Sequence, residues 1–432
     1  MQENKTDVIV VGAGPAGVAA AITIARADKK VLLVERGSFA GSKNVFGGAI
    51  YVEPTKEIFP NFLESAPIER FITEHRYSLL TKQEATTISY KTRETVQNAC
   101  TVIRAKFDRW CVEEAQKAGV YFAPNTVVKK LLVDKGKVIG IKTDLEEYYA
   151  NIVIIADGVN SLLAKQLEMR KTIKPKHTAL SVKEVYKLDK NLIEERFNLN
   201  ETSGCVYELV GYPMDNVLGL GFLYTNKNSV SLGLGVGLED LKKNKINVND
   251  LLENLKQHPL ISNLIKDGEL LEYNAHLIPE GGFNRIPKLY GNGVMIAGDA
   301  AMLVNNLHWE GTNLAFKSGK FAGETAIEAL NNKDYSENSL SLYRQKLENS
   351  YVIKDLKTYK NILTNIEPRS KSFFGYYPKK IAEFFETFTN VNTKPKKTEF
   401  RKYIKSWFTD RSLQELFADI FTIIKSVIGV LK

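Results

Sequence analysis

The chain has 432 residues, of which 44% are hydrophobic and 25% charged, and its formal net charge is +9. This length predicts two or three structural units, and the composition is that of a folded protein without low-complexity segments. Three cysteines argue against a disulfide framework and exclude a four-thiolate iron–sulfur cluster within the chain, and the five histidines show no metal-ligand spacing, so no metal site is predicted.

The start of the chain, MQENKTDVIVVGAG, reads as a strand that breaks at glycines. It lacks the basic region, apolar core and cleavage site of a signal peptide, so none is expected. Nowhere do about 18 apolar residues follow one another, and we therefore expect no transmembrane helix.

A strand, a glycine-rich turn, a helix and a second strand follow in this order. Gly12, Gly14 and Gly17 fit the G-x-G-x-x-G fingerprint. The first glycine permits a tight turn, the second lets a pyrophosphate approach the backbone, and the third lets the helix pack on the strand. Glu35 closes the second strand, where an acid accepts hydrogen bonds from ribose hydroxyls. An acid at this position favours an unphosphorylated ribose, so the pattern predicts FAD or NAD and not NADP.

The next loop, GSKNVFGGAIY at 41–51, contains no catalytic acid, base or nucleophile. Its adjacent glycines, Gly47 and Gly48, would let the backbone pass close to a flat ring, because glycine tolerates unusual dihedral angles. Lys43 and Asn44 would donate hydrogen bonds there, although an exposed surface lysine is the simpler interpretation of Lys43. We expect this loop to form part of a cofactor cradle.

The stretch 102–122 is predicted to form a short strand and a helix, with Arg104 at the start of the helix. An arginine there would contact a phosphate or ribityl group, and the alternative is a surface arginine at a helix start. A small sheet is expected after it, with a turn at 135–137.

Two later strand ends decide between FAD and NAD. One strand ends in Ala156-Asp157-Gly158, and another ends in Gly298-Asp299. The second is followed by a loop and a predicted helix from about 310 to 330. A carboxylate there would bind a ribitol hydroxyl, and the helix start at 311–313 would present free N–H groups and a positive dipole end to a reduced flavin. The pattern favours FAD.

The stretch 217–238, VLGLGFLYTNKNSVSLGLGVGL, is predicted to form two paired strands joined by a polar turn. Its glycines alternate as they do in a strand, so it is not a second dinucleotide fingerprint. No other such start occurs, and we predict no dedicated NAD(P)H site.

The last 82 residues, 351–432, carry 16 Lys and Arg against 8 Asp and Glu, which is +8 of the total charge of +9. They also hold 15 aromatic residues. The segment 412–432 begins with a capping box, Ser412 and Glu415, and continues as an apolar helical stripe. The pattern predicts docking on a membrane or a partner, or packing on the protein's own core. Nucleic acid is not expected, because no recognition motif is present.

The motif order G-x-G-x-x-G…E, R-x-x-F-D-x-W, A-D-G and A-G-D-A-A resembles flavoproteins of the glutathione-reductase-type FAD fold. Within that group the chain is similar to the FixC-type electron-transfer-flavoprotein:quinone oxidoreductases. GSKNVFGG and EGGFNRIPKL (280–289) are the most specific of the matching stretches, which run from residue 7 to about 380.

The resemblance implies an α/β fold: a Rossmann-type FAD domain interleaved with an antiparallel-sheet quinone domain, followed by a C-terminal helical region. The expected bounds are 1–80, 100–170 and 288–330 for the FAD domain, 81–99 and 171–287 for the quinone domain, and 331–432 for the helical, basic and aromatic region. The residues predicted to bind FAD are Gly12, Ala13, Gly14, Pro15, Ala16, Gly17, Glu35, Arg36, Asn44, Gly47, Gly48, Arg104, Val128, Ala156, Asp157, Gly158, Gly298, Asp299, Gly311, Thr312 and Asn313.

For the quinone, the resemblance points to Gly219 and Gly221, although the family has adjacent glycines at this place and here the pair is split. It implies electron flow from electron-transfer flavoprotein, through a separate ferredoxin-like iron–sulfur subunit, to a membrane quinone. No side chain is predicted to act as a catalytic acid, base or nucleophile. The expected location is the cytoplasm, in peripheral contact with the inner face of the cell membrane.

Two other functions stay open at this point. One is reduction of an isoprenoid double bond by a geranylgeranyl-reductase-type enzyme, which shares the fold. The other is a non-catalytic FAD relay inside a larger complex.

Overall fold

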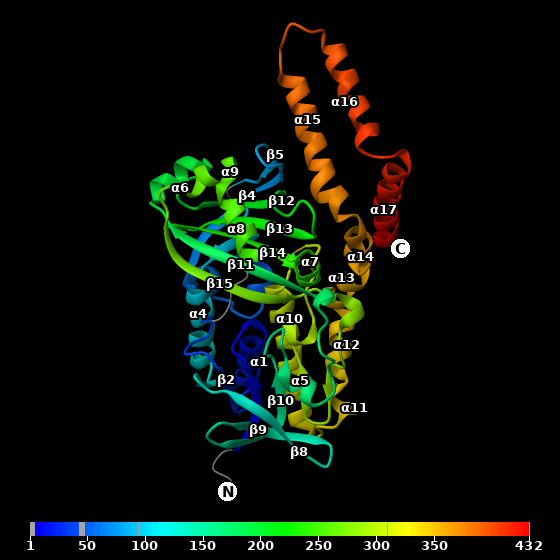
Figure 1. The fold of residues 1–432 in the computed structure, drawn as a ribbon. Helices are drawn as coiled ribbons and strands as arrows, with labels where there is room; N and C mark the ends of the chain where they lie inside the picture. The colour runs from blue at the N-terminus through cyan, green and yellow to red at the C-terminus, as the bar shows by residue number, and fades with distance from the viewer. Residues whose placement is uncertain (1–4, 43–47, 94, 309, 432) are drawn as a thin grey trace. The chain divides into compact units, whose positions relative to one another are not determined.

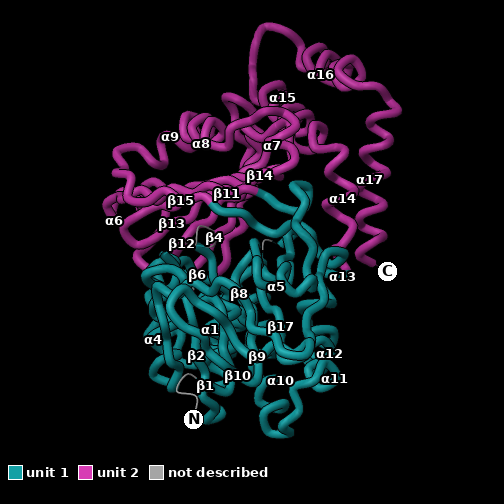
Figure 2. The backbone as a smooth tube through the Cα atoms, turned by 60° about the horizontal axis from the view of Figure 1, so that its bottom comes forward, with its two compact units in different colours: residues 1–71, 97–179, 276–357 teal, residues 72–96, 180–275, 358–432 magenta. Residues whose placement is uncertain are grey.

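The structure is a computed structural model, and it describes residues 5–42, 48–93, 95–308 and 310–431. The chain divides into two compact units (Figure 2). Unit 1 contains residues 1–71, 97–179 and 276–357, and unit 2 contains residues 72–96, 180–275 and 358–432. The expected domain bounds differ from these ranges in detail and stay a prediction, but the interleaving of a mixed α/β fold is confirmed.

Unit 1 is built on a sheet with the strand order β16-β17-β10-β1-β2-β7. These strands are β1 (Lys5–Val11), β2 (Val31–Val34), β7 (Tyr121–Ala123), β10 (Glu147–Ile155), β16 (Tyr290–Gly291) and β17 (Val294–Ile296). The pairs of β1 with β2 and β10, of β2 with β7 and of β10 with β17 are parallel. A hairpin of β8 (Val128–Asp134) and β9 (Lys137–Thr143) continues from β10 in antiparallel pairing.

The helices of unit 1 pack on this sheet through side chains that are almost fully buried. They are α1 (Pro15–Ala25), α2 (Val52–Lys56), α3 (Phe62–Ser65), α4 (Arg104–Lys117), α5 (Leu162–Gln166), α10 (Thr312–Asn332), α11 (Glu337–Leu340), α12 (Leu342–Asn349) and the first part of α13 (Tyr351–Tyr359). Within unit 1, β3 (Ala49–Tyr51) also pairs with β6 (Ala99–Val102), which in turn pairs with the start of β4 (Ile68–Leu80).

Helices α1 and α10 lie side by side, and glycine makes their close approach possible (Figure 1). A Cβ atom at Gly319 of α10 would lie 2.0 Å from the carbonyl oxygen of Ala16 in α1. One turn later, a Cβ at Gly323 would lie 2.9 Å from the oxygen of Ala20. Two backbones can approach this closely only where no side chain separates them.

Unit 2 contains a sheet in the order β15-β11-β14-β13-β12-β4, with β5 on the other side of β4, and the pairs β12–β13, β13–β14 and β4–β5 are antiparallel. Its strands are β5 (Ala85–Lys91), β11 (Thr178–Lys187), β12 (Ser203–Gly211), β13 (Gly219–Thr225), β14 (Ser229–Gly237), β15 (Glu269–Pro279) and the later part of β4. The predicted hairpin at 217–238 is confirmed as β13 and β14, which pair from Gly219↔Val236 to Thr225↔Val230. Its helices α6 (Lys190–Phe197), α7 (Leu238–Asn244), α8 (Val248–Gln257) and α9 (Pro259–Ile265) contribute to a second apolar core.

The last part of unit 2 is helical and consists of α14 (Ile362–Ile366), α15 (Tyr377–Thr389), α16 (Lys396–Asp410) and α17 (Leu413–Leu431), with a π-helical turn at Lys371–Tyr376. The predicted capping box starts α17. The Ser412 N–H donates to Glu415 Oε2 over 3.0 Å, and the Glu415 N–H donates to Ser412 Oγ over 3.3 Å. Figure 1 shows α15 and α16 as a hairpin of helices.

These C-terminal helices bury charge and expose apolar side chains. Lys380 is fully buried, and its Nζ lies 2.7 Å from Asp410 Oδ2 and 2.8 Å from Glu383 Oε2. Asp419 is also fully buried and bridges Arg369 and Arg411. A water-facing helix shows the opposite distribution.

The apolar side chains of α17 lie in solvent instead of in a core. Phe417 is 67% exposed, Phe421 66% and Val427 51%. Together with the exposed Phe384, Phe385, Phe388, Ile404, Phe408, Ile420, Ile423, Ile424 and Ile428 they form what we call the C-terminal apolar face. In the described part of the chain, no helix has the length and apolarity needed to cross a bilayer.

We predict that Gly319→Ala destabilises the protein, because the added methyl group would force α10 away from the Ala16 carbonyl. The expected loss in free energy of unfolding is about 1–3 kcal/mol, the usual effect of overpacking. Thermal and urea unfolding of the two proteins at equal FAD saturation would measure it.

Gly429→Ala in α17 is the matched control, since no heavy atom lies within 4 Å of its added Cβ. This change should leave stability equal or raise it by up to about 1 kcal/mol, because alanine favours a helix more than glycine. Equal stability of Gly319→Ala and wild type would contradict the packing argument.

Candidate functional site

The predicted cofactor segments of unit 1 meet because three parallel strands end at the same edge of the sheet. Val11 pairs with Ile155, and Ile155 pairs with Ile296. The residues after these three strand ends are Gly12, Ala156 and Ala297. The Ala156 N–H donates to the Val11 carbonyl and the Ala297 N–H to the Ile155 carbonyl, each over 2.9 Å. Ligands of open α/β sheets bind at this carboxyl edge.

The first glycine turn has the geometry that the fingerprint requires. Gly12 has φ +101°, and a Cβ there would lie 2.3 Å from the carbonyl oxygen of Ala156. A Cβ at Gly17 would lie 1.8 Å from the oxygen of Gly12. In contrast, nothing lies within 4 Å of a Cβ built at Gly14, which is the N-cap of α1 and makes no side-chain cap hydrogen bond. Open space thus faces the N–H groups of the first turn of α1, beside Pro15 at its start.

Glu35 faces this turn from the end of β2. Its Oε2 accepts a hydrogen bond from the Ala13 N–H over 3.0 Å, and its Oε1 accepts one from the Gly37 N–H over 2.7 Å. Each carboxylate oxygen keeps capacity for a further donor such as a ribose hydroxyl. The Thr126 N–H donates to the Glu35 carbonyl over 2.8 Å, which fixes the segment leading to Val128 at the start of β8.

Part of the loop at 41–51 is described. Asn44 and Gly47 lie outside the described residues, as does Lys43. Gly41 has φ +88°, and a Cβ there would lie 2.8 Å from the Arg104 carbonyl oxygen, so the loop begins tight against the start of α4. At its end, the Gly48 carbonyl accepts a hydrogen bond from the Val102 N–H over 2.7 Å.

Arg104 is buried, in contrast to the alternative of a surface arginine. It is 7% exposed, and its Nε and Nη2 donate to Asp108 Oδ1 and Oδ2 over 2.8 and 2.9 Å. This bidentate pair holds the guanidinium in one orientation. Contact of Arg104 with a phosphate or ribityl group stays a prediction.

The two aspartates at the strand ends lie in surroundings that disfavour their charge. Burial raises the pKa of Asp299 to about 6, although Arg104 and Arg170 oppose the rise. Burial also raises the pKa of Asp157. Asp157 Oδ1 is buried without a hydrogen-bond partner in the described part of the chain. Such atoms are the ones that a bound polyhydroxylated chain would satisfy.

Helix α10 presents its N-terminus near the Asp299 turn. Its N-cap is Gly311, with no side-chain cap, and the N–H groups from Thr312 onward start a helix of 21 residues. Asn313 is 5% exposed, and within the described residues its Oδ1 lacks a hydrogen-bond partner. The Gly298 N–H donates to Ser318 Oγ over 3.0 Å, which joins the turn to α10. A helix start of this kind favours negative charge on a ligand.

The sequence interpretation missed two residues beside these segments. Arg170 is 5% exposed and donates from Nη1 to the carbonyl oxygen of Ala300, directly after Asp299, over 2.9 Å. Glu280 donates its N–H to the His177 carbonyl over 2.8 Å, and burial raises the pKa of its carboxyl to about 8, against a hydrogen bond from Asn306. No local motif marks Arg170; for Glu280 the only signal was its place in EGGFNRIPKL.

The predicted quinone glycines lie in unit 2 on β13, and both are buried. A Cβ at Gly219 would lie 3.0 Å from a methyl carbon of Val236, and one at Gly221 would lie 3.1 Å from Leu209 Cβ. Neighbouring side chains of the same unit thus occupy the space above both glycines. Their contact with a quinone stays a prediction.

Comparison with known families divides the chain into three matched parts. Residues 7–166 match the family "FAD dependent oxidoreductase", residues 178–278 match "ETF-QO, ubiquinone-binding", and residues 366–428 match "ETF-QO/FixC family C-terminal domain".

Among curated proteins, the chain is similar to protein FixC of Azorhizobium caulinodans, with 40% identity over 428 residues that cover 98% of each chain. It is also similar to a probable electron transfer flavoprotein-quinone oxidoreductase of Escherichia coli K12, with 41% identity over 91% of this chain and 93% of the relative.

Among solved structures, the chain resembles a geranylgeranyl bacteriochlorophyll reductase-like protein of Thermoplasma acidophilum, with a TM-score of 0.68 and 18% identity over 92% of this chain and 90% of the other. A myxobacterial chondrochloren halogenase has a TM-score of 0.66 with 15% identity, over 89% of this chain and 90% of the other. At these identities the likeness shows the fold alone.

We predict that Glu280→Gln removes a pH-dependent loss of stability. The pKa of Glu280 is about 8 in the folded protein, against about 4.3 in an unfolded chain. Between these values the folded protein keeps a proton that the unfolded chain releases, so wild-type stability falls as pH rises, by at most about 1.4 kcal/mol per pH unit.

The glutamine side chain stays neutral at every pH. The free energy of unfolding of the variant should therefore rise relative to that of wild type as pH rises, until the difference levels off above about pH 8. Urea unfolding of both proteins, in the same state of FAD loading, at pH steps from about 5 to about 9 measures this. Glu64→Gln, an exposed carboxyl on α3, is the control and should follow wild type. Parallel curves for wild type and Glu280→Gln would show that this carboxyl titrates normally.

Proposed function

Because the chain belongs to the FixC and electron-transfer-flavoprotein:quinone oxidoreductase family, we propose that it passes electrons from a reduced electron-transfer flavoprotein, through FAD, to a membrane quinone. The resemblance drawn from its motifs is confirmed by these matches, and the chain is an FAD-dependent oxidoreductase. The donor, the acceptor and the ferredoxin-like iron–sulfur subunit that would stand between donor and flavin belong to the proposal.

One observation supports the acceptor most directly: residues 178–278 match the ubiquinone-binding family over a continuous stretch. That stretch contains β11 to β14 and nearly all of β15, which is the antiparallel sheet predicted to form the quinone domain. The hydrogen-bonded strands β13 and β14 carry the two glycines that the family resemblance points to. A quinone is therefore favoured over other small acceptors.

The residues of unit 1 fit FAD. Gly14 leaves open space before α1, where a pyrophosphate would approach, and Glu35 would accept from ribose hydroxyls. Asp299 would hold a ribityl hydroxyl, and Gly311 to Asn313 would face the negatively charged side of the flavin. When bound, FAD supplies electron transfer in single or paired steps, which a donor of single electrons and a two-electron acceptor both require.

In this activity the chain's own residues would bind the FAD, orient it and shield it from water. The N-termini of α1 and α10 offer N–H groups that are not satisfied within their helices, and such preorganised donors stabilise negative charge without reorganising. Arg104 and Arg170 are buried near Asp299 and oppose the rise in its pKa that burial causes, so they also favour negative charge in its surroundings. No side chain needs to act as a nucleophile for electron transfer.

The C-terminal apolar face supports a membrane location for the acceptor reaction. Its phenylalanine and isoleucine side chains are exposed, while Lys380 and Asp419 are buried in ion pairs behind it. Exposed apolar surface of this extent marks an interaction site, and the basic residues of the same region suit an anionic membrane surface. We infer that this face lies in the interfacial layer of the membrane from which quinone is drawn.

The prediction for the acceptor is that reduced protein is reoxidised anaerobically by a water-soluble quinone, without NADH or NADPH. The bound flavin would be reduced by dithionite, freed of excess reductant, and followed by its visible absorption after quinone addition. Failure of the quinone to restore the oxidised spectrum, while ferricyanide restores it, would overturn the proposal.

The same preparation separates the two other functions. A mass gain in an unsaturated isoprenoid lipid incubated with reduced protein would identify a prenyl reductase. Quinone reduction seen only in a complex with partner subunits, and never in the isolated chain, would identify a relay.

The prediction for the membrane is that Phe417→Ser with Phe421→Ser weakens binding to vesicles of phosphatidylglycerol by about tenfold or more. Full burial of a phenylalanine contributes about 1.5–3 kcal/mol, and even partial loss at two positions exceeds the 1.4 kcal/mol that equals tenfold. Co-sedimentation with vesicles measures it. Ile88→Ser, at a side chain of unit 2 that is also 67% exposed, is the control and should bind as wild type does. Equal binding by all three proteins would rule out this face.

A further inference from the structure

The most specific stretch of the sequence, EGGFNRIPKL, forms one wall of a groove in unit 1 that the proposed function does not use. The groove encloses about 650 Å³ between this stretch, α12 and α13. Its apolar lining consists of Phe283, Ile286, Pro287, Leu289 and Ile353. Arg344, Lys354 and Lys357 stand at its rim, together with Asn284 and Glu348. A volume of this size accommodates a group of side chains or a small ligand.

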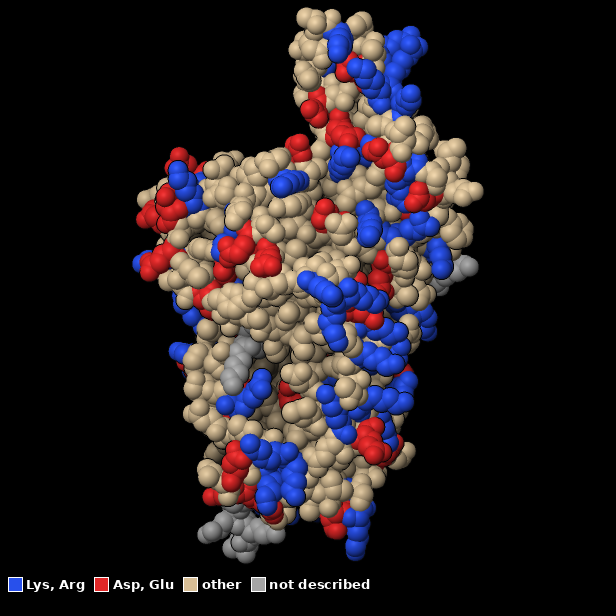
Figure 3. All heavy atoms as spheres, in the orientation of Figure 1, with Lys and Arg blue, Asp and Glu red and all other residues tan. Residues whose placement is uncertain are grey.

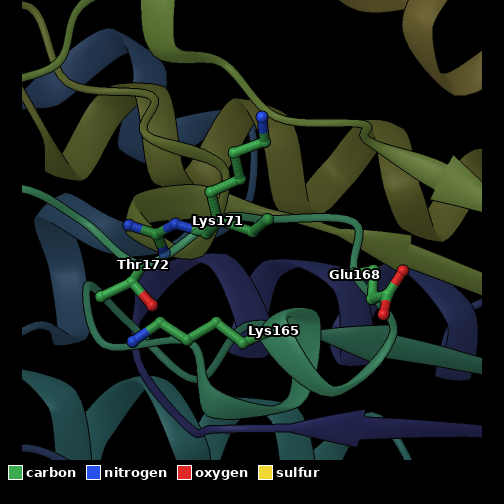
Figure 4. Close-up of a pocket in the computed structure, with 5 residues that line it drawn as sticks. Lys165, Glu168, Lys171 and Thr172 are labelled. Carbon is green, nitrogen blue, oxygen red and sulfur yellow. The ribbon is translucent and has the colours of Figure 1, made fainter.

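A second hollow lies next to this groove. It encloses about 420 Å³ and is lined by Lys165, Glu168, Arg170, Lys171 and Thr172 (Figure 4). The Lys288 N–H donates to the Met169 carbonyl over 3.3 Å, so the wall of the groove and the segment of the hollow are neighbours. We call the two together the basic groove.

The lining of the basic groove is strongly positive for this part of the chain. It holds six Lys and Arg side chains and two Glu side chains; four of the six cations belong to residues 1–350, whose net charge as a whole is only +1. Arg344 and Glu348 form an ion pair over 2.7 Å, and Arg170 is buried and interacts with Asp157 and Asp299; the other cations of the lining are Lys165, Lys171, Lys354 and Lys357. Figure 3 shows Lys and Arg gathered over the part of the surface that carries α5, α12 and α13.

The basic groove backs directly onto the predicted flavin site. Arg170 lines the hollow and donates to the Ala300 carbonyl, next to Asp299. Its Nη2 also lies 2.8 Å from Met302 Sδ, in the same turn. A molecule seated in the groove would therefore lie against the turn that is predicted to hold the ribityl chain. This favours an occupant that exchanges electrons with the flavin.

The apolar side chains of the groove differ from those of the C-terminal apolar face. Leu289 and Ile353 are buried and Phe283, Ile286 and Pro287 half-buried, so apolar surface lies at the base and charge at the rim. Lipid tails would need exposed apolar side chains that project outward, as on α17. A concave apolar base with a cationic rim suits a protein whose acidic residues surround an apolar contact.

We propose that the basic groove is the docking surface for an acidic redox protein that delivers electrons to the flavin of this chain. The proposal rests on the proposed function, which supplies the final acceptor of the electrons. The partner is oxidised by two electrons in total. The quinone takes up those two electrons and two protons from solvent and becomes a quinol. Cations at the rim steer the partner, and the apolar base holds it.

The test uses FAD-loaded protein and an acidic [2Fe–2S] ferredoxin of the plant type as the probe. Lys171→Glu with Lys357→Glu reverses one charge in each half of the groove, and both lysines are exposed. The second-order rate constant for flavin reduction by this ferredoxin should fall about tenfold or more at low ionic strength and should lose most of its dependence on salt. The dissociation constant of the two oxidised proteins, measured calorimetrically, should rise about tenfold as well.

Lys130→Glu with Lys135→Glu on the β8–β9 hairpin is the matched control, because it makes the same change of net charge on the same unit at two exposed lysines that do not line the groove. This control should behave as wild type. Reduction by dithionite should be equal in all three proteins, which would show that the flavin site is intact.

Unchanged rates and affinity after the groove reversal would overturn the proposal, and so would a wild-type rate that does not depend on salt. Loss of binding to phosphatidylglycerol vesicles, with ferredoxin kinetics unchanged, would assign the groove to lipid instead. Failure of reduced protein to reduce a quinone would count against the proposed function only, because docking is measured at the flavin and by calorimetry.

Discussion

The register of three parallel strands decides where the chemistry of this protein can occur. Val11, Ile155 and Ile296 lie in line across β1, β10 and β17, so three loops that are distant in sequence leave the sheet at one edge. A shift of one residue in either pairing would point the strand's side chains to the opposite face and separate the aspartates from the glycine turn. The close contact of α10 with α1 depends on the same register, since α1 follows the first of these loops and α10 follows the third.

Much of this arrangement could be predicted from sequence because its signals are local. The strand at 31–34 and the helix predicted from about 310 to 330 correspond to β2 and to α10 at Thr312–Asn332. The capping box of Ser412 and Glu415 forms with both of its hydrogen bonds. Glycine fingerprints, strand ends and capping boxes each span a few residues, and their geometry follows from backbone sterics.

What the sequence did not reveal depends on contacts across long separations. Arg170 matters because it reaches a carbonyl 130 residues later in the chain, and nothing in its neighbourhood in the sequence marks it. The unusual pKa of Glu280 comes from burial, which no local pattern encodes. The buried ion pairs of Asp419 in α17 likewise join residues 8 and 50 positions apart. The apolar stripe of this helix could therefore be recognised from the sequence, but whether the stripe faces solvent or the protein core could not.

The interleaving of the two units sets the order in which the protein can become active during its synthesis. The residues predicted to bind FAD extend from Gly12 to Asn313, and unit 1 takes up its last segment only after residue 276. At typical rates of translation, roughly 15–60 s pass between the emergence of the first glycine turn and that of the α10 N-terminus. During this interval the turn has no partner at the third strand, and β10, once it is made, lacks its neighbour β17. A chain that ended before α10 would lack the last of the segments predicted to bind FAD, at 311–313.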